Sequence, residues 1–115
     1  MSEIKALTEK IKKFRDERDW MQFHNHKDVA LSLVLEAAEV LEHFQWKKPG
    51  EVEAHGKACK DEIADELADV AMYLFELADN LGIDLPKAID IKLAKNAQKY
   101  PVEKAKGSSK KYTEI

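Results

Sequence analysis

The sequence predicts an all-α protein that folds as a four-helix bundle. Apolar residues recur at three- and four-residue spacing over long stretches, no segment has the pattern of a strand, and only four Gly and three Pro interrupt 115 residues. Four such stretches joined by short connections are typical of a bundle. The length predicts a single domain over residues 1–115, with a helical core over about 2–100 and a basic tail over about 101–115.

The first two predicted helices flank a segment rich in aromatic residues. The first covers about residues 2–18, begins at the N-cap Ser2, and has one apolar face formed by Ile4, Leu7, Ile11 and Phe14. Residues 19–26 have no helical period and predict a loop. The second helix covers about residues 27–45 and is apolar over most of its circumference, which predicts burial by more than one neighbour.

The third and fourth predicted helices follow a break at Pro49-Gly50. The third is long, over about residues 51–81, and carries a near-heptad apolar stripe made of Ile63, Leu67, Val70, Leu74, Leu77 and Leu81. The fourth is expected to begin at Asp84 and to end near Tyr100, before Pro101. The third helix has a second, smaller apolar side, and one short chain cannot cover both sides, so we expect a homo-oligomer.

Charge and composition exclude several classes of protein. There are 19 Lys and Arg against 22 Asp and Glu, whereas a protein that binds a nucleic-acid polymer usually has a clear basic excess. No apolar run approaches the roughly 20 residues of a membrane helix, so no membrane role is expected. The single cysteine, Cys59, fits a reducing compartment, which predicts a cytoplasmic protein.

The chemical signal lies in carboxylates on two otherwise apolar helices. Glu36 and Glu39 share a face of the second helix, and Glu66 and Asp69 share a face of the third. If these helices pack together, up to four carboxylates converge, and such a cluster takes up protons or binds cations. Ligands that are all oxygen favour Mg²⁺, Mn²⁺ or Ca²⁺ over zinc, and Mg²⁺ held by carboxylates suits phosphoryl-transfer chemistry.

Two other interpretations of these acids stay open on the residues alone. Acids on helices usually face water, and many helices carry E-x-x-D pairs by chance, as Glu62 and Asp65 show here. A di-iron carboxylate centre needs Glu-x-x-His pairs on two helices. His43 follows Glu39 by four residues rather than three, and the third helix has no matching His, which argues against that centre.

The acid pattern resembles that of a known family. The run Glu36-Ala-Ala-Glu39, with 26 residues between it and Glu66-Leu-Ala-Asp69, resembles the E-x-x-E … E-x-x-D pattern of the MazG-like, all-α nucleoside triphosphate pyrophosphohydrolases. Further segments resemble the dCTP pyrophosphatase branch of that family: Arg18-Asp19-Trp20, Gln22-Phe23-His24, Phe44-Gln45-Trp46-Lys47, Asp84-Leu85-Pro86, Lys99-Tyr100-Pro101 and Gly107-Ser108-Ser109 … Lys111-Tyr112-Thr113. The resemblance extends from about Phe14 to Glu114.

The resemblance implies an enzyme that hydrolyses a dNTP to the monophosphate and pyrophosphate. The implied substrate is dCTP or a 5-modified dCTP, the implied role is house-cleaning of the nucleotide pool, and the implied assembly is a dimer or tetramer. The implied catalytic residues are also the ligands of Mg²⁺, or of Mn²⁺ as the alternative: Glu36, Glu39, Glu66 and Asp69. The implied nucleotide contacts are Trp20, His24, Trp46, Tyr73 and Asn96. The metals would bind the triphosphate and help to generate the attacking hydroxide.

These implied contacts agree with physical expectation, although ordinary structural roles compete with them. Aromatic faces stack on bases, and His24 and Asn96 could supply the hydrogen bonds that select cytosine. A Trp in a loop is more often a packing anchor, however, and a lone His is usually structural. Ile11 stands where vertebrate members of the branch have a His, so this chain lacks that polar contact.

Two alternative functions follow. One is a broader house-cleaning pyrophosphohydrolase that acts on other or non-canonical nucleoside triphosphates. The other is a non-catalytic helical scaffold, which has no reason to retain converging acids. Leu35 stands where larger MazG-type proteins carry an additional Glu, so the implied site consists of four acids.

Overall fold

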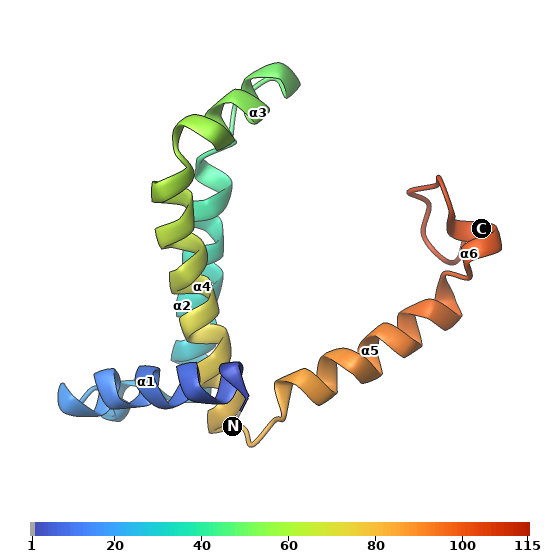
Figure 1. Ribbon diagram of the computed structural model, residues 1–115. Coiled ribbons are helices and arrows are strands. Elements are labelled where there is room, and N and C mark those ends of the chain that lie inside the picture. Colours follow the sequence, from blue (N-terminus) through green and yellow to red (C-terminus); the bar gives the residue numbers. More distant parts are fainter. Residues whose placement is uncertain (1) are drawn as a thin grey trace. The chain divides into compact units, whose positions relative to one another are not determined.

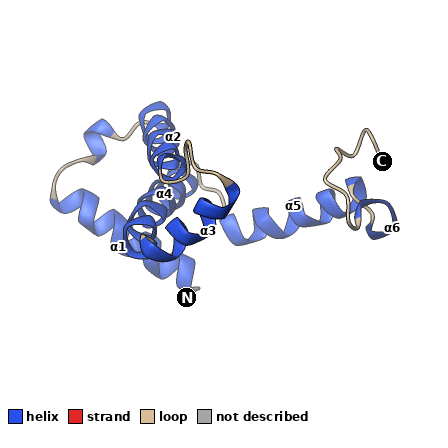
Figure 2. Ribbon diagram, turned by 90° about the horizontal axis from the view of Figure 1, so that it is seen from above, coloured by secondary structure: helices blue, strands red, loops and turns tan. Residues whose placement is uncertain are grey.

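The structure is a computed structural model that describes residues 2–115, and it consists of helices joined by turns and loops (Figure 1). No strand occurs in the described residues, as Figure 2 shows, so the predicted all-α class is confirmed. The elements in chain order are α1 (Glu3–Glu17), the short 3-10 helix η1 (Met21–Phe23), α2 (His26–Glu42), α3 (Pro49–Ala58), α4 (Lys60–Asn80), α5 (Leu85–Lys99) and α6 (Val102–Ala105).

Polar side chains cap the N-termini of three helices, two of them at positions that the sequence predicts. Each cap accepts a hydrogen bond from a backbone N–H that has no partner within the first turn of its helix. The bonds join Ser2 to Lys5 N at 3.1 Å, Asn25 to Asp28 N at 2.8 Å, and Asp84 to Lys87 N at 3.2 Å. These residues therefore set where α1, α2 and α5 begin.

The prediction of one long third helix over about residues 51–81 is wrong, because the structure divides it at Cys59. The backbone of Cys59 leaves the helical region, with φ −111° and ψ 28°, between the end of α3 and the start of α4. Cys59 N still donates to the carbonyl of His55 at 2.9 Å, and its own carbonyl accepts from Ile63 N at 3.0 Å. The chain thus changes direction while its hydrogen bonds are kept, and α3 diverges from α4 (Figure 1).

Helices α2 and α4 form the centre of the first unit, Met1–Gly82. They lie side by side and run antiparallel, and α1 lies against the C-terminal part of α4 (Figure 1). Polar contacts tie α1 to α4: the Lys12 ammonium lies 3.4 Å from the Asp79 carboxylate, and Arg15 Nη1 lies 3.4 Å from Asn80 Oδ1. This arrangement places the acids of α2 opposite those of α4.

The apolar core of a single chain is small. Among residues 2–115, the buried apolar side chains are Val29 and Ala78. Large apolar side chains on α2 remain more than half exposed, namely Leu31, Val34, Leu35 and Leu41. Within the described part of one chain, α2 packs extensively against α4 alone. The expectation that more than one neighbour buries the second helix is therefore wrong for a single chain.

The second unit, Ile83–Ile115, holds α5, α6 and the basic C-terminal segment. The tail folds back onto the end of α5, where the rings of Tyr100 and Tyr112 meet edge to face with their centroids 6.0 Å apart. The Lys99 ammonium lies 5.0 Å from the centre of the Tyr112 ring. None of the helices in residues 2–115 has the length and apolar character needed to cross a membrane. That the two units form one domain stays a prediction.

Candidate active site

Packing of α2 against α4 brings the predicted carboxylates close enough to influence one another. Burial raises the pKa of Glu36 above its ordinary value, and Glu39, Asp69 and Glu66 raise it further through a hydrogen bond and through charge repulsion. One carboxylate oxygen of Glu36 and one of Glu66 are buried without a hydrogen-bond partner. Buried oxygens of this kind are costly unless a proton or a cation satisfies them.

The chemistry of these side chains fits a hard divalent cation. All four supply carboxylate oxygens, which Mg²⁺ and Mn²⁺ prefer, and the other three raise the pKa of Glu36. No three His, Cys, Asp or Glu side chains within residues 2–115 already surround a common point as ligands would. Carboxylates repel one another without a counter-ion, so these side chains alone are not expected to form a closed cage.

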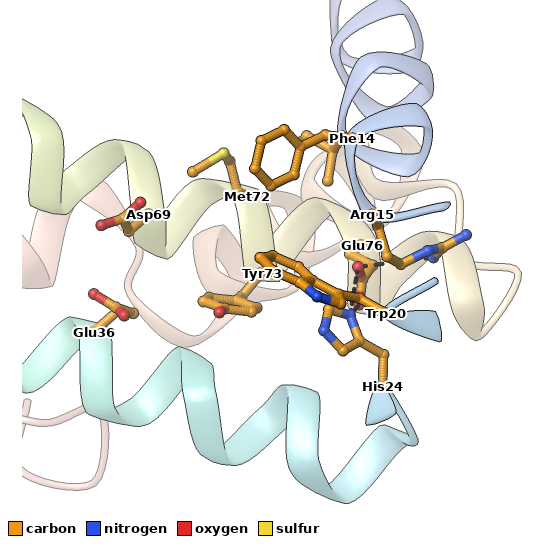
Figure 3. A pocket seen from close by; sticks show the side chains of 10 residues that line it. Phe14, Arg15, Trp20, His24, Glu36, Asp69, Met72, Tyr73 and Glu76 are labelled. Carbon is orange, nitrogen blue, oxygen red and sulfur yellow. Dashed lines mark hydrogen bonds and ion pairs between the residues drawn. The ribbon is translucent and has the colours of Figure 1, made fainter. Parts of the chain in front are cut away.

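A pocket of about 260 Å³ opens beside the carboxylates (Figure 3). Glu36 and Asp69 lie at one end of it and aromatic side chains at the other. Three of the predicted nucleotide contacts line this pocket: Trp20, His24 and Tyr73. The remaining walls come from Ile11, Phe14, Arg15, Met72 and Glu76. Acids that can hold a cation are therefore continuous with an apolar, aromatic space suited to a planar ligand.

A sharp turn after α1 carries Trp20 over the pocket. Asp19 adopts the left-handed backbone region with φ 55°, and Trp20 N then donates to the carbonyl of Arg15 at 3.1 Å. The Trp20 ring meets the Phe14 ring edge to face, with centroids 5.8 Å apart, and the Arg18 guanidinium lies 3.7 Å from the centre of the Phe14 ring. The predicted aromatic loop is thus an ordered wall of the site.

Tyr73 connects the aromatic end of the pocket with the acidic end. Burial raises the pKa of its hydroxyl, and the nearby Glu36 charge raises it further. A phenol that keeps its proton can donate a hydrogen bond to a phosphate or sugar oxygen. The Tyr73 ring also lies beside His24, with the ring centroids 6.4 Å apart.

Two charged residues of the pocket are absent from the sequence prediction. Glu76 is only 2% exposed and Arg15 only 6% exposed, and the Arg15 Nη1 atom lies 3.7 Å from the Glu76 Oε1 atom. Both carboxylate oxygens of Glu76 also lie within 2.9 Å of His24 Nδ1. Glu76 continues the helical spacing of Asp69 and Tyr73 by one further turn, so that spacing could have identified it, whereas nothing in the sequence marks Arg15.

One predicted contact residue, Trp46, does not line the pocket of the first unit, and another, Asn96, belongs to the second unit. Trp46 is 91% exposed, follows α2 and has φ 68°. Asn96 is half-buried on α5, which belongs to the second unit, and its part in the site stays a prediction.

Two histidines lie next to Glu66, one of the predicted metal ligands. His43 Nε2 lies 2.6 Å from Glu66 Oε2, and His43 Nδ1 lies 3.0 Å from His55 Nε2. Burial lowers the pKa of His55, and the charges of Lys47 and His43 lower it further. The break at Cys59 is what lets α3 bring His55 back to His43.

Comparisons with known proteins agree with this geometry. A model of the MazG-like family matches residues 31–115, a segment that contains all four predicted metal ligands. Human dCTP pyrophosphatase 1 is 43% identical over 104 residues, and the rat protein of the same name is 42% identical; each match covers 89% of this chain and 61% of the relative. This chain therefore spans about three fifths of the length of those relatives.

The same fold occurs in a solved structure. The crystal structure of a pyrophosphatase from Archaeoglobus fulgidus matches with a TM-score of 0.83 and 36% sequence identity. The match covers 88% of this chain and 94% of the archaeal one.

Proposed function

This chain belongs to the MazG-like family, and on that premise we propose that it hydrolyses dCTP, or a 5-modified dCTP, to dCMP and pyrophosphate. The observation that carries the proposal is the pocket in which Asp69 and Glu36, which has a buried oxygen without a hydrogen-bond partner, adjoin an aromatic wall. The relatives named dCTP pyrophosphatase support the choice of base. The role would be house-cleaning of the nucleotide pool, and the lone Cys59 supports a cytoplasmic setting.

The residues that would hold the metal are Glu36, Glu39, Glu66 and Asp69, with Mg²⁺ as the ion and Mn²⁺ as the alternative. The raised pKa of Glu36 and its buried carboxylate oxygen without a hydrogen-bond partner support this assignment, because both indicate negative charge that lacks a counter-charge. When bound, the metal neutralises phosphate oxygens and activates water as a nucleophile.

The reaction requires one bond to form and one to break at the α-phosphorus. A water oxygen bonds to that phosphorus, the bond to the oxygen bridging the α- and β-phosphates breaks, and pyrophosphate leaves with that oxygen. The chain's own residues orient the nucleotide for this step. Trp20 offers a face for the base, and the protonated Tyr73 hydroxyl donates to an oxygen near the acidic end.

We also propose that the working form is a dimer or tetramer of this chain. The uncovered apolar side chains of α2 support self-association, because monomeric proteins rarely expose large contiguous apolar patches. In such an assembly, the exposed Trp46 would face a neighbouring chain and could contribute to that chain's pocket.

Product analysis of the purified chain tests the activity. The chain is incubated with Mg²⁺ and, in separate reactions, dCTP, 5-methyl-dCTP, dATP, dGTP and dTTP, and the products are separated by anion exchange. We expect dCMP and pyrophosphate in equal amounts, a preference for the cytosine nucleotides, and loss of turnover with a chelator. Equal rates on all bases would favour the broader pyrophosphohydrolase, and release of orthophosphate would contradict the proposed cleavage site.

A matched pair of variants on α4 separates catalysis from the scaffold alternative. Glu66→Gln removes one proposed ligand and should lower turnover by at least about a hundredfold, since even the partners of metal ligands are worth 10- to 100-fold. Asp65→Asn removes the neighbouring, exposed carboxylate and should retain normal turnover. Equal effects of the two variants, or no turnover by the unmodified chain, would contradict the proposed site.

A further inference from the structure

A buried ion pair stands directly behind His24, and the proposed reaction does not use it. Glu76 is almost wholly enclosed at 2% exposure, and the residue Arg15 beside it is 6% exposed. Figure 3 shows both at the end of the pocket away from Glu36 and Asp69, with Glu76 joined to His24. A buried, charged group costs folding free energy, so its retention calls for a functional explanation that can be tested.

The contact with Glu76 determines which nitrogen of His24 carries the proton. A carboxylate has no hydrogen to donate, and its two oxygens lie 2.9 and 2.8 Å from His24 Nδ1, so the proton of this hydrogen bond belongs to Nδ1. In the neutral ring, Nε2 is then left with a lone pair and can only accept a hydrogen bond. Arg15 always carries its positive charge, and its Nη1 atom lies 3.7 Å from the Glu76 Oε1 atom.

His24 presents this nitrogen toward the space that the base would occupy. The ring lines the pocket beneath Trp20, and the nitrogen that does not contact Glu76 lies on the side of Tyr73 (Figure 3). A hydrogen-bond acceptor at that place can accept from an amino group, whereas it repels a carbonyl oxygen, which is also an acceptor. Cytosine carries an amino group at position 4, where uracil and thymine carry an oxygen.

We propose that Glu76, held by Arg15, is a specificity-determining residue that makes His24 a hydrogen-bond acceptor and so selects nucleotides whose base carries an exocyclic amino group. This inference rests on the proposed function, because it takes the aromatic end of the pocket as the site of the base. Glu76 lines the pocket, but the role proposed for it needs no contact with the nucleotide. It acts through His24, as a positioning residue.

The tautomer of His24 can be measured without any substrate. In the ¹⁵N-labelled full chain, the shifts of the ring nitrogens distinguish Nδ1–H from Nε2–H and from the doubly protonated ring. We expect the proton on Nδ1 and the lone pair on Nε2, and in Glu76→Gln we expect the Nε2–H form to become populated. The control is Asp79→Asn on the same helix, whose carboxylate pairs with Lys12 and lies outside the pocket, and it should leave His24 unchanged.

Binding of two product-like nucleotides tests selection separately from catalysis. Titration calorimetry with dCMP and with dUMP compares ligands that differ at position 4 of the base. We expect the unmodified chain and Asp79→Asn to bind dCMP at least about tenfold more tightly than dUMP, as one mispaired hydrogen-bonding group costs. In Glu76→Gln, this ratio should fall close to one.

The outcomes separate this inference from the proposed function. Three results would overturn the inference. The first is a His24 ring that is protonated on Nε2, or on both nitrogens, in the unmodified chain. The others are an affinity ratio of dCMP to dUMP that is unchanged in Glu76→Gln, and failure of both nucleotides to bind. If Glu76→Gln does not fold, His24→Ala replaces it, and a ratio unchanged there overturns the inference equally. If the chain hydrolyses dCTP but the affinity ratio of dCMP to dUMP is the same with and without Glu76, the inference alone is refuted. If the affinity ratio depends on Glu76 but the chain does not hydrolyse dCTP, the proposed function alone is refuted.

Discussion

At the scale of single residues, Glu36 shows how a site suited to cations costs stability when no cation is bound. Its pKa is raised because burial and the surrounding carboxylates both disfavour the charged form. The folded state therefore holds the Glu36 proton more readily than the unfolded state does. The fold therefore loses stability as pH rises from 4.5, the ordinary pKa of Glu36, through its raised pKa in the folded state.

Glu36→Gln should consequently stabilise the metal-free chain at pH 7, and its advantage should disappear as pH falls below 4.5, where both states of the natural residue are protonated. Urea unfolding in the presence of a chelator, repeated from pH 7 to pH 4, measures the difference. Addition of Mg²⁺ should stabilise the natural chain more than the variant. A variant that is less stable than the natural chain at pH 7 without metal would contradict this account of Glu36.

At the scale of elements, local signals determine where helices begin, and contacts between helices determine where they bend. Asn25 caps α2, the helix that carries Glu36, by accepting a hydrogen bond from Asp28 N at 2.8 Å. By contrast, Cys59 divides α3 from α4 without Pro, Gly or any other local breaker at that position. The sequence analysis predicts the caps Ser2 and Asp84, but it predicts neither the Asn25 cap nor this break.

Asn25→Ala should destabilise the chain by about 1 kcal/mol, the usual cost of losing an N-cap. Asn25→Ser is the matched control, because a serine hydroxyl can accept the same hydrogen bond and should recover most of the loss. Chemical unfolding at one fixed protein concentration measures both variants. Equal stability of the alanine and serine variants would show that the cap does not hold the start of α2.

At the scale of the whole molecule, the apolar surface exceeds what one chain buries. Val34 and Leu41 are 60% and 65% exposed and lie seven residues apart on α2, so they share a face of that helix. Leu67 and Leu74 on α4 and its C-cap residue Leu81 also lie seven residues apart, and they are 53%, 39% and 49% exposed. Apolar rows at this spacing are typical of helices that pack against further helices.

Val34→Lys should therefore shift the chain toward the monomer and lower its midpoint of thermal unfolding, because it places a charge in the proposed interface. Light scattering coupled to gel filtration measures the mass, and unfolding at several protein concentrations measures the coupling of assembly to stability. Lys27→Ala, an exposed polar position on the same helix, is the control. A natural chain that is monomeric and unfolds independently of its concentration would exclude the proposed assembly.

The sequence by itself determined the features that depend on neighbours along the chain. Helical periodicity indicated the all-α class, capping residues indicated the starts of α1 and α5, and the two acid pairs on apolar helices indicated where charge would gather. Each is visible within a few turns of helix, since residues three or four apart share a face whatever the rest of the fold does.

Only the tertiary structure decided the features that join distant segments. His24 and Glu76 are 52 residues apart and Arg15 and Asn80 are 65 apart, so no local pattern connects them. The same holds for the pairing of His55 with His43, which requires α3 to fold back at Cys59. Periodicity shows which face of a helix a residue occupies. The partner that residue meets depends on how the helices pack, which sets the chemistry of the pocket.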